Sequence, residues 1–186
     1  MGILRWLGEK TLKVLGWKLV GTIPDDVKKC IITVAPHTSI DDFILGRLAY
    51  CSIDKPVKFL IKKEFFDVPI LKQILLKLGG IPVDRSRNNN IVNQVSAMFD
   101  KYDTLNIVIA PEGTRKCVNK WKKGFYYIAL KANVPIVLGF LDFKKKELGF
   151  GPILHPTGNY EEDWKIMEDF YRGFTAKHPE RYNLSN

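Results

Sequence analysis

Hydrophobic positions along this chain follow two alternating patterns. Short β-branched or apolar runs bounded by turn residues predict buried strands, and segments with apolar residues three and four positions apart predict the helices between them. The predicted strands are residues 30–35, 57–61, 81–83, 105–110, 135–143 and 147–154, and the predicted helices are residues 41–50, 69–78, 88–102, 124–132 and 161–175. This alternation predicts an α/β fold, a single-domain sandwich with a largely parallel mixed central sheet flanked by helices.

The N-terminal segment adds a two-faced helix, predicted for residues 3–20. Arg5, Glu9 and Lys13 form one polar stripe. The opposite side carries the apolar residues Leu4, Leu7, Val14 and Leu15, and Trp6 and Trp17 flank the stripe. Such a helix can lie in a membrane interface with its tryptophans at headgroup level, or it can pack on its own domain. We therefore divide the chain into an N-terminal amphipathic helix and turn, residues 1–26, and a main domain, residues 27–186.

Composition and charge narrow the setting of this domain. The 186 residues, of which 46% are hydrophobic, are enough for one domain with a real core. The 29 Lys and Arg exceed the 20 Asp and Glu, and the net charge of +9 favours an anionic partner: nucleic acid, an anionic membrane surface, a phosphorylated substrate or an acidic carrier protein. Three cysteines far apart in sequence argue against a disulfide framework and favour the reducing cytosol. No transmembrane helix or signal peptide is expected.

Chemically versatile residues gather directly after three of the predicted strands. Residues 36–42 (PHTSIDD) follow the first, residues 84–87 (DRSR) follow the third, and residues 111–116 (PEGTRK) follow the fourth. Ligand sites in open α/β folds lie beyond the carboxyl ends of the strands, so these three segments are expected at one edge of the sheet. Their clustering is informative because polar residues at that edge are not needed to build a core.

His37 and Asp42 are a candidate acid–base pair. Residues five apart on a regular helix would point about 140° away from each other, so the two meet only if the chain turns between strand and helix. A carboxylate on one imidazole nitrogen would leave the other nitrogen as a general base for a hydroxyl proton. Two alternatives stay open: a capping residue and a satisfied turn histidine, or Asp41 as the partner of His37.

Other catalytic chemistries have weaker support in the sequence. Ser39 is not in a nucleophile elbow, and Cys117 has no sign of a paired base. The remaining histidines, His155 and His178, stand in no spacing typical of metal ligands. We therefore predict neither a covalent nucleophile nor a metal site.

The segment that follows the fourth of these strands is a candidate phosphate site. Gly113 permits a sharp turn, Thr114 can donate a hydroxyl, and Arg115 can hold a phosphate through two hydrogen bonds. Arg85, at another strand end, could supply a second clamp. The alternatives are a local ion pair between Glu112 and Arg115 that closes the turn, and a surface role for Arg85.

The order and spacing of these motifs resemble the glycerolipid acyltransferase family, which includes 1-acylglycerol-3-phosphate (lysophosphatidate) acyltransferases. His37-x4-Asp42 is similar to the family's first block, which supplies the base and its orienting carboxylate. Residues 80–85 (GIPVDR) resemble the second block and residues 111–115 (PEGTR) the third, both assigned to the acceptor. Residues 134–137 (VPIV) resemble the fourth block, which is tied to the acyl pocket. From first to last, these blocks span about residues 30–140, which is most of the chain.

The resemblance implies a mechanism and its partners. His37 would deprotonate an acceptor hydroxyl while Asp42 holds the imidazole, and the alkoxide would attack the thioester of acyl-CoA or acyl carrier protein without an acyl-enzyme. The acceptor, a glycerol-phosphate-type lysolipid, would be bound by Arg85, Glu112, Gly113, Thr114 and Arg115. No cofactor or metal is implied. An enzyme of phospholipid biosynthesis of this kind is expected to be cytoplasmic and bound peripherally to the anionic inner face of the membrane.

Two other functions are weighed against acyl transfer. A thioesterase-like hydrolase could use His37 to activate water and would release free fatty acid without an acceptor. A basic α/β domain could also bind nucleic acid, but the basic residues are spread along the chain and no helix-turn-helix, RNA-recognition or zinc-finger signature occurs. We therefore expect no nucleic-acid partner.

Overall fold

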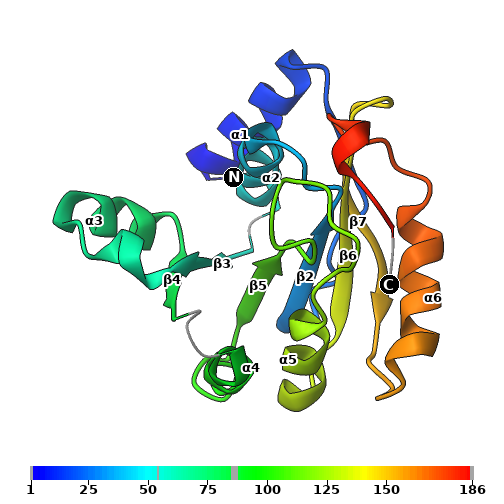
Figure 1. Cartoon of the computed structure of the whole chain (residues 1–186). Helices are drawn as coiled ribbons and strands as arrows, with labels where there is room; N and C mark the ends of the chain where they lie inside the picture. Colours follow the sequence, from blue (N-terminus) through cyan, green and yellow to red (C-terminus); the bar gives the residue numbers. More distant parts are fainter. Residues whose placement is uncertain (1, 54, 85–87, 185–186) are drawn as a thin grey trace.

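One mixed sheet of seven strands organises the molecule, whose computed structural model describes residues 2–53, 55–84 and 88–184 (Figure 1). The strands are β1 (Lys18–Val20), β2 (Lys29–Ala35), β3 (Val57–Lys62), β4 (Gly80–Val83), β5 (Leu105–Ile109), β6 (Ile136–Asp142) and β7 (Glu147–Leu154), in the spatial order β1-β7-β6-β2-β5-β3-β4. Five of them, β6, β2, β5, β3 and β4, are parallel, and β7 pairs antiparallel with β6. The predicted α/β fold with a largely parallel mixed sheet is confirmed.

Helices cover both faces of this sheet (Figure 1). They are α1 (Ile3–Val14), α2 (Ile40–Ser52), α3 (Pro69–Lys77), α4 (Asn88–Ser96), α5 (Gly124–Ala132) and α6 (Tyr160–Tyr171), with short 3₁₀ helices η1 (Lys63–Phe66) and η2 (Pro179–Arg181). The bounds of α5 agree with the sequence prediction. The predicted helix 88–102 ends at Ser96, because Met98 and Phe99 form i→i−3 hydrogen bonds that close a tight turn.

The core is divided by the sheet into two layers of apolar side chains. Alternate residues of β2 point to opposite faces, so Ile31 packs with side chains of α4, α5 and α6, while Ile32 packs with Tyr50 of α2. A further cluster joins Leu12 of α1 to α2 and β7. Helices α1 and α2 therefore lie on one face of the sheet, and α4, α5 and α6 lie on the other.

The N-terminal segment is partly helix and partly strand. The prediction of a helix over residues 3–20 is therefore wrong beyond Val14, where α1 ends. Gly16, with φ of 76°, ends the helix: its N–H donates to the Lys13 carbonyl and the Trp17 N–H donates to the Leu12 carbonyl. The chain then forms β1, which pairs with β7. Residues on both sides of position 26, the boundary proposed from the sequence, thus contribute to one sheet.

One face of α1 packs on its own domain, and the rest of the helix is exposed. Gly8 lies so close to α2 that an added Cβ would be 2.8 Å from the Leu48 carbonyl oxygen, and Leu12 is buried beside it. Ile3, Leu4, Trp6, Leu7, Val14 and Leu15 remain exposed. The packing on α2 accounts for one face only, so the structure leaves α1 with an apolar surface toward solvent.

Candidate functional site

The site is built at a switch point of the sheet. Strands β2 and β5 are parallel neighbours, and the helix that follows β2 lies on the opposite face from the helix that follows β5. The two connections therefore diverge at the carboxyl ends of these strands, the position at which open α/β folds bind their ligands. The segment 36–42 leaves β2 and the segment 110–116 leaves β5, so two of the three predicted segments meet here.

His37 and Asp42 come together at the end of β2. The Nδ1 atom of His37 lies 3.4 Å from the Oδ2 atom of Asp42. The Asp42 side chain is 1% exposed, whereas the His37 side chain is 23% exposed and so remains reachable from solvent. Because Nδ1 is turned toward the carboxylate, Nε2 on the other edge of the imidazole ring is the atom that can meet a substrate. The distance is longer than that of a good hydrogen bond, and catalytic hydrogen bonds of this kind shorten when a substrate binds.

The start of α2 fixes the Asp42 carboxylate. Asp42 Oδ2 accepts hydrogen bonds from the backbone N–H groups of Thr38 at 2.6 Å and Ser39 at 2.7 Å. Ser39 Oγ donates to Asp42 Oδ1 at 3.2 Å and accepts from the Asp41 N–H at 3.0 Å. Ser39 and Asp42 also form a capping box, in which the Ser39 side chain accepts the Asp42 N–H and the Asp42 side chain accepts the Ser39 N–H. One carboxylate thus takes part in the helix cap and also lies beside the His37 ring. The Ser39 hydroxyl, the candidate nucleophile, is engaged in the cap.

The alternative partner, Asp41, turns away from His37. Its carboxylate pairs instead with Lys177, from the C-terminal segment that lies across this edge. The next residue of that segment, His178, donates its backbone N–H to the Thr38 hydroxyl at 3.2 Å. Sequence reasoning missed this segment, because residues 140 positions apart in sequence carry no local signal of their contact.

Glu112 joins the end of β5 to the end of β2. Its Oε1 atom accepts the backbone N–H of His37 at 2.7 Å, and the residue is only 1% exposed. Its Oε2 atom is buried and has no hydrogen-bond partner within the described residues. Burial raises the pKa of Glu112 to about 8. The hydrogen bond from the His37 N–H lowers this pKa, and the nearby Asp42 charge raises it. Glu112 is therefore largely protonated at neutral pH.

Residues 113–115 of the PEGTR segment lie toward the surface. Gly113 has φ of 68° and donates its N–H to the Ala110 carbonyl, which closes the turn. An added Cβ at Gly113 would lie 2.9 Å from Cδ of Lys122, so the lysine side chain crosses directly over this glycine. Thr114 is half-buried and Arg115 is exposed. The expected alternative, an ion pair between Glu112 and Arg115, does not form among the described residues.

Lys122 was not singled out from the sequence. The only sequence signal for it is a short run of lysines on either side of Trp121. Arg85, the predicted second clamp, lies outside the described residues. The strand that precedes it in sequence, β4, is separated from β5 by β3.

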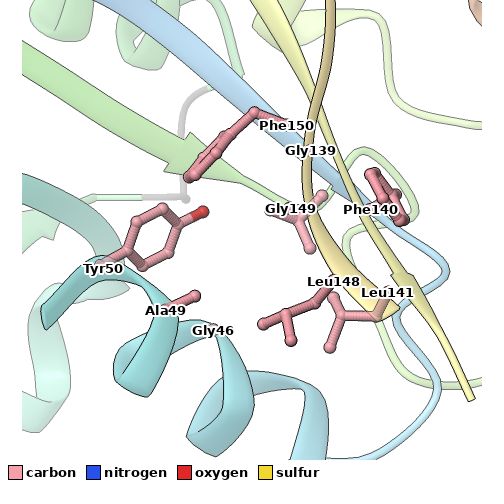
Figure 2. A pocket seen from close by; sticks show the side chains of 10 residues that line it. Gly46, Ala49, Tyr50, Gly139, Phe140, Leu141, Leu148, Gly149 and Phe150 are labelled. Atoms are coloured by element: carbon pink, nitrogen blue, oxygen red, sulfur yellow. The ribbon is translucent and has the colours of Figure 1, made fainter. Parts of the chain in front are cut away.

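An apolar pocket lies between α2 and the sheet (Figure 2). The pocket is shallow: its cavity volume is about 20 Å³, within about 260 Å³ of empty space that includes open solvent. Its walls are Val34 of β2, Gly46, Ala49 and Tyr50 of α2, Gly139, Phe140 and Leu141 of β6, and Leu148, Gly149 and Phe150 of β7. Gly46 is four residues after Asp42 and shares its helix face, about 6 Å farther along the axis. The pocket therefore begins one helical turn from Asp42, the carboxylate beside the candidate base.

Taken together, the fold and the site define an α/β protein with a histidine–carboxylate pair at a sheet switch point, flanked by a basic loop and an apolar pocket. Among the described residues, no group of three or more His, Cys, Asp or Glu side chains is placed to hold a metal ion. The described helices also include none with the length and apolar character needed to cross a membrane. This arrangement suits proton abstraction from a hydroxyl group.

The chain belongs to the acyltransferase family. A family model described as Acyltransferase matches residues 18–137, which include His37, Asp42 and the PEGTR segment. The family relationship predicted from the four sequence blocks is therefore confirmed.

Curated relatives name the substrates of similar proteins. The chain is 30% identical to a 1-acyl-sn-glycerol-3-phosphate acyltransferase of Cocos nucifera over 57% of its length and 35% of that protein. It is 29% identical to a lysophosphatidylcholine acyltransferase of Drosophila melanogaster over 76% of this chain and 26% of that protein. It is also 29% identical to a 1-acyl-sn-glycerol-3-phosphate acyltransferase of Limnanthes douglasii, over 73% of this chain and 47% of that protein. The chain thus spans about a quarter to a half of these relatives.

A solved structure shares the fold. The crystal structure of the 1-acyl-sn-glycerophosphate (LPA) acyltransferase PlsC from Thermotoga maritima superposes with a TM-score of 0.61 and 18% identity, and covers 94% of this chain and 80% of that one. At this identity the likeness concerns the fold, which the two chains share over nearly the whole length described here.

Proposed function

We propose that this protein transfers a fatty acyl group from a thioester donor to the hydroxyl of a glycerol-phosphate-type lysolipid. The observation that carries the proposal is the 3.4 Å approach of His37 Nδ1 to the buried Asp42 carboxylate at the sheet switch point, inside the region that matches the family. The printed names of the curated relatives, acyltransferases acting on 1-acyl-glycerol phosphate or lysophosphatidylcholine, support a lysolipid as the acceptor.

His37 acts as the general base in this mechanism. Its Nε2 atom takes the proton of the acceptor hydroxyl, and the oxygen attacks the thioester carbonyl carbon. The carbon–sulfur bond then breaks, and the imidazolium returns the proton to the departing thiolate. Asp42, held by two backbone N–H groups at the positive end of α2, orients the ring and stabilises its protonated form. No acyl-enzyme forms, so a nucleophilic side chain is not required.

The acceptor phosphate is bound by the basic loop after β5. Arg115 is exposed and can hold two phosphate oxygens, and Lys122 passes over Gly113 next to it. Arg85 is proposed as a further clamp on the strength of its sequence block. Glu112, predicted to bind the acceptor, is buried against the His37 backbone and acts here as a positioning residue that ties the phosphate loop to the catalytic turn.

The donor is acyl-CoA or acyl carrier protein, and its acyl chain occupies the apolar pocket of Figure 2. Two features support this placement: the lining is apolar, and the pocket starts one helical turn from Asp42 on the same face of α2. The net charge of +9 suits either donor, because both carry phosphate and one is an acidic protein. The exposed apolar side chains of α1 support peripheral contact with the inner face of the membrane.

The test is an assay of thiol release and product formation with the purified protein. Acyl-CoA and acyl carrier protein are offered as donors with a panel of lysolipids that differ in head group. His37→Ala should lower turnover by at least ~10²-fold with the fold intact, and Asp42→Asn should lower it strongly because the ring loses its orienting charge.

Asp41→Asn is the matched control, since this carboxylate pairs with Lys177 and lies on the same helix turn. It should change turnover much less than Asp42→Asn. If Asp41→Asn is the more damaging change, the assignment of the orienting carboxylate fails. If thiol release yields free fatty acid and does not depend on any acceptor, the protein is a hydrolase and the transferase proposal fails.

A further inference from the structure

A second apolar surface projects from the sheet edge, apart from α1. The segment 62–78, which contains η1 and α3 and is called here the α3 platform, packs mainly on β4 through a few contacts (Figure 1). No residue of α3 is buried, whereas α5 and α6 bury four and five side chains respectively. The exposed apolar side chains of the platform are Phe65, Val68, Ile70, Ile74, Leu76 and Leu78. Ile70, at 78% exposed, is among the most exposed large apolar residues of the described chain.

The α3 platform stands at the same edge of the sheet as the candidate site. It begins directly after the carboxyl end of β3, and β3 is parallel to β5 and, through β5, to β2. Because parallel strands end at one edge, the platform, His37 and Glu112 lie on one side of the molecule. A flat surface that met the platform would therefore also face the candidate site.

The charges of the platform are matched to an anionic surface. Lys62, Lys63, Lys72 and Lys77 are all exposed, against Glu64 and Asp67, which gives a net charge of 4 − 2 = +2 on this short segment. Within the described part of the chain, none of these four lysines is in an ion pair. Exposed apolar side chains bordered by unpaired lysines are the composition of a helix that lies in a membrane interface.

We propose that the α3 platform docks on the surface of an anionic bilayer, with its apolar side chains inserted among the lipids and its lysines at the headgroups. The inference rests on the proposed function, because a lysolipid acceptor lies in a bilayer. At about 13 Å, a nine-residue helix is far shorter than the ~30 Å hydrocarbon core, so α3 lies in the interface and does not cross it. An acidic carrier protein would match the lysines, but it would leave the six exposed apolar side chains unexplained.

Flotation of the full-length protein with vesicles tests this docking. The vesicles are phosphatidylcholine alone, or phosphatidylcholine with phosphatidylglycerol. The double variant Ile70→Gln/Ile74→Gln should partition at least ~10-fold more weakly onto both vesicles, because two apolar side chains no longer insert. Lys72→Gln/Lys77→Gln should partition ~10-fold more weakly onto the anionic vesicles and unchanged onto the neutral ones.

Matched controls come from α6, on the other face of the sheet. Ile166 is 52% exposed and Lys165 is exposed, so Ile166→Gln and Lys165→Gln change the same residue types on another exposed helix. These controls should float like the unchanged protein. All replaced side chains are exposed, so thermal unfolding should show unchanged stability and separate loss of docking from loss of fold.

Three results would overturn the proposal. The first is flotation of the platform variants equal to that of the controls. The second is unchanged flotation with lost binding to acyl carrier protein, which would make the platform a carrier-protein site. The third is a change of oligomeric state in the platform variants, which would make it an interface between two copies.

The docking and the proposed function can fail separately. Turnover of a water-soluble short-chain acceptor does not need a bilayer and should survive in every platform variant. If the unchanged protein transfers no acyl group to any acceptor but floats through the platform, the docking stands and the proposed function fails. If the soluble acceptor is acylated and the platform variants float normally, the function stands and the docking fails.

Discussion

Replacing Glu112 by glutamine should remove a pH dependence from the stability of the fold. In the folded chain, burial raises the pKa of this carboxyl from 4.5 to about 8. A raised carboxyl pKa means that the folded state holds the proton over a range where the unfolded state has lost it. Stability from this group is therefore complete below about pH 4.5, falls as the pH rises, and levels off above about pH 8.

The size of the effect follows from linkage. Each pH unit within that window costs about 1.4 kcal/mol of unfolding free energy, and the whole window costs on the order of 5 kcal/mol. Asp42 and the His37 N–H are the neighbours that affect the Glu112 carboxyl most after burial itself. Tyr171 and Tyr182 also sense its charge, but burial raises the pKa of both tyrosines further above their normal value, so they stay neutral throughout.

The assay is thermal or urea unfolding of the unchanged protein and Glu112→Gln at a series of pH values. The stability of Glu112→Gln relative to the unchanged protein should rise by roughly 3 kcal/mol between about pH 5 and about pH 7.5. For a domain of this size that corresponds to a relative shift in Tm on the order of 10 °C. Taking the difference between the two proteins cancels the titrating groups that do not interact with the Glu112 charge.

A second variant, Glu112→Ala, distinguishes the effect of the hydrogen-bond acceptor at position 112 from the effect of its charge. Glutamine keeps an oxygen for the His37 N–H, and alanine leaves that buried donor unpaired at a cost of about 1–3 kcal/mol. Turnover should therefore survive in Glu112→Gln and fall in Glu112→Ala, with little change in the acceptor KM. A stability difference between the unchanged protein and Glu112→Gln that does not vary with pH would refute the reasoning.

Two further predictions concern the substrates. Arg115→Ala should raise the acceptor KM by ~10-fold or more and change the donor KM less, because a charge-assisted contact with phosphate, worth about 1.5–3 kcal/mol, is lost. Steady-state kinetics with each substrate varied in turn measures both constants, and an unchanged acceptor KM would contradict the phosphate assignment. Gly46→Leu should fill the pocket, because a Cβ at this position has only Cε2 of Tyr50 nearby, at 3.7 Å. Turnover measured with donors of different chain length should then shift toward shorter acyl chains. An unaltered chain-length profile would show that the acyl chain does not occupy this pocket.

The chain's local patterns determined most of the elements and the order of the motifs. The helix 124–132 and the strand 147–154 have the predicted bounds, because their apolar spacing and flanking turn residues act within the element itself. The blocks around His37 and the PEGTR segment were recognisable for the same reason: their residue types stand at fixed short spacings. What the sequence left open was which of two adjacent acids faces the imidazole.

Tertiary structure settled that choice and added what no local pattern carries. Asp42 meets His37 and Asp41 meets Lys177 because a helix turns adjacent residues by about 100°, and only the docking of α2 on the sheet decides which of the two faces inward. The local pattern of the three residues of β1 predicts the end of a helix, but their pairing with β7 makes them a strand. Glu112 is a charged residue type that is usually found on the surface. Its burial against the His37 backbone arises only because β2 and β5 are neighbours in the folded sheet. Strand pairing and burial depend on residues far apart in the chain, so the free energies that fix them are absent from any local window of sequence.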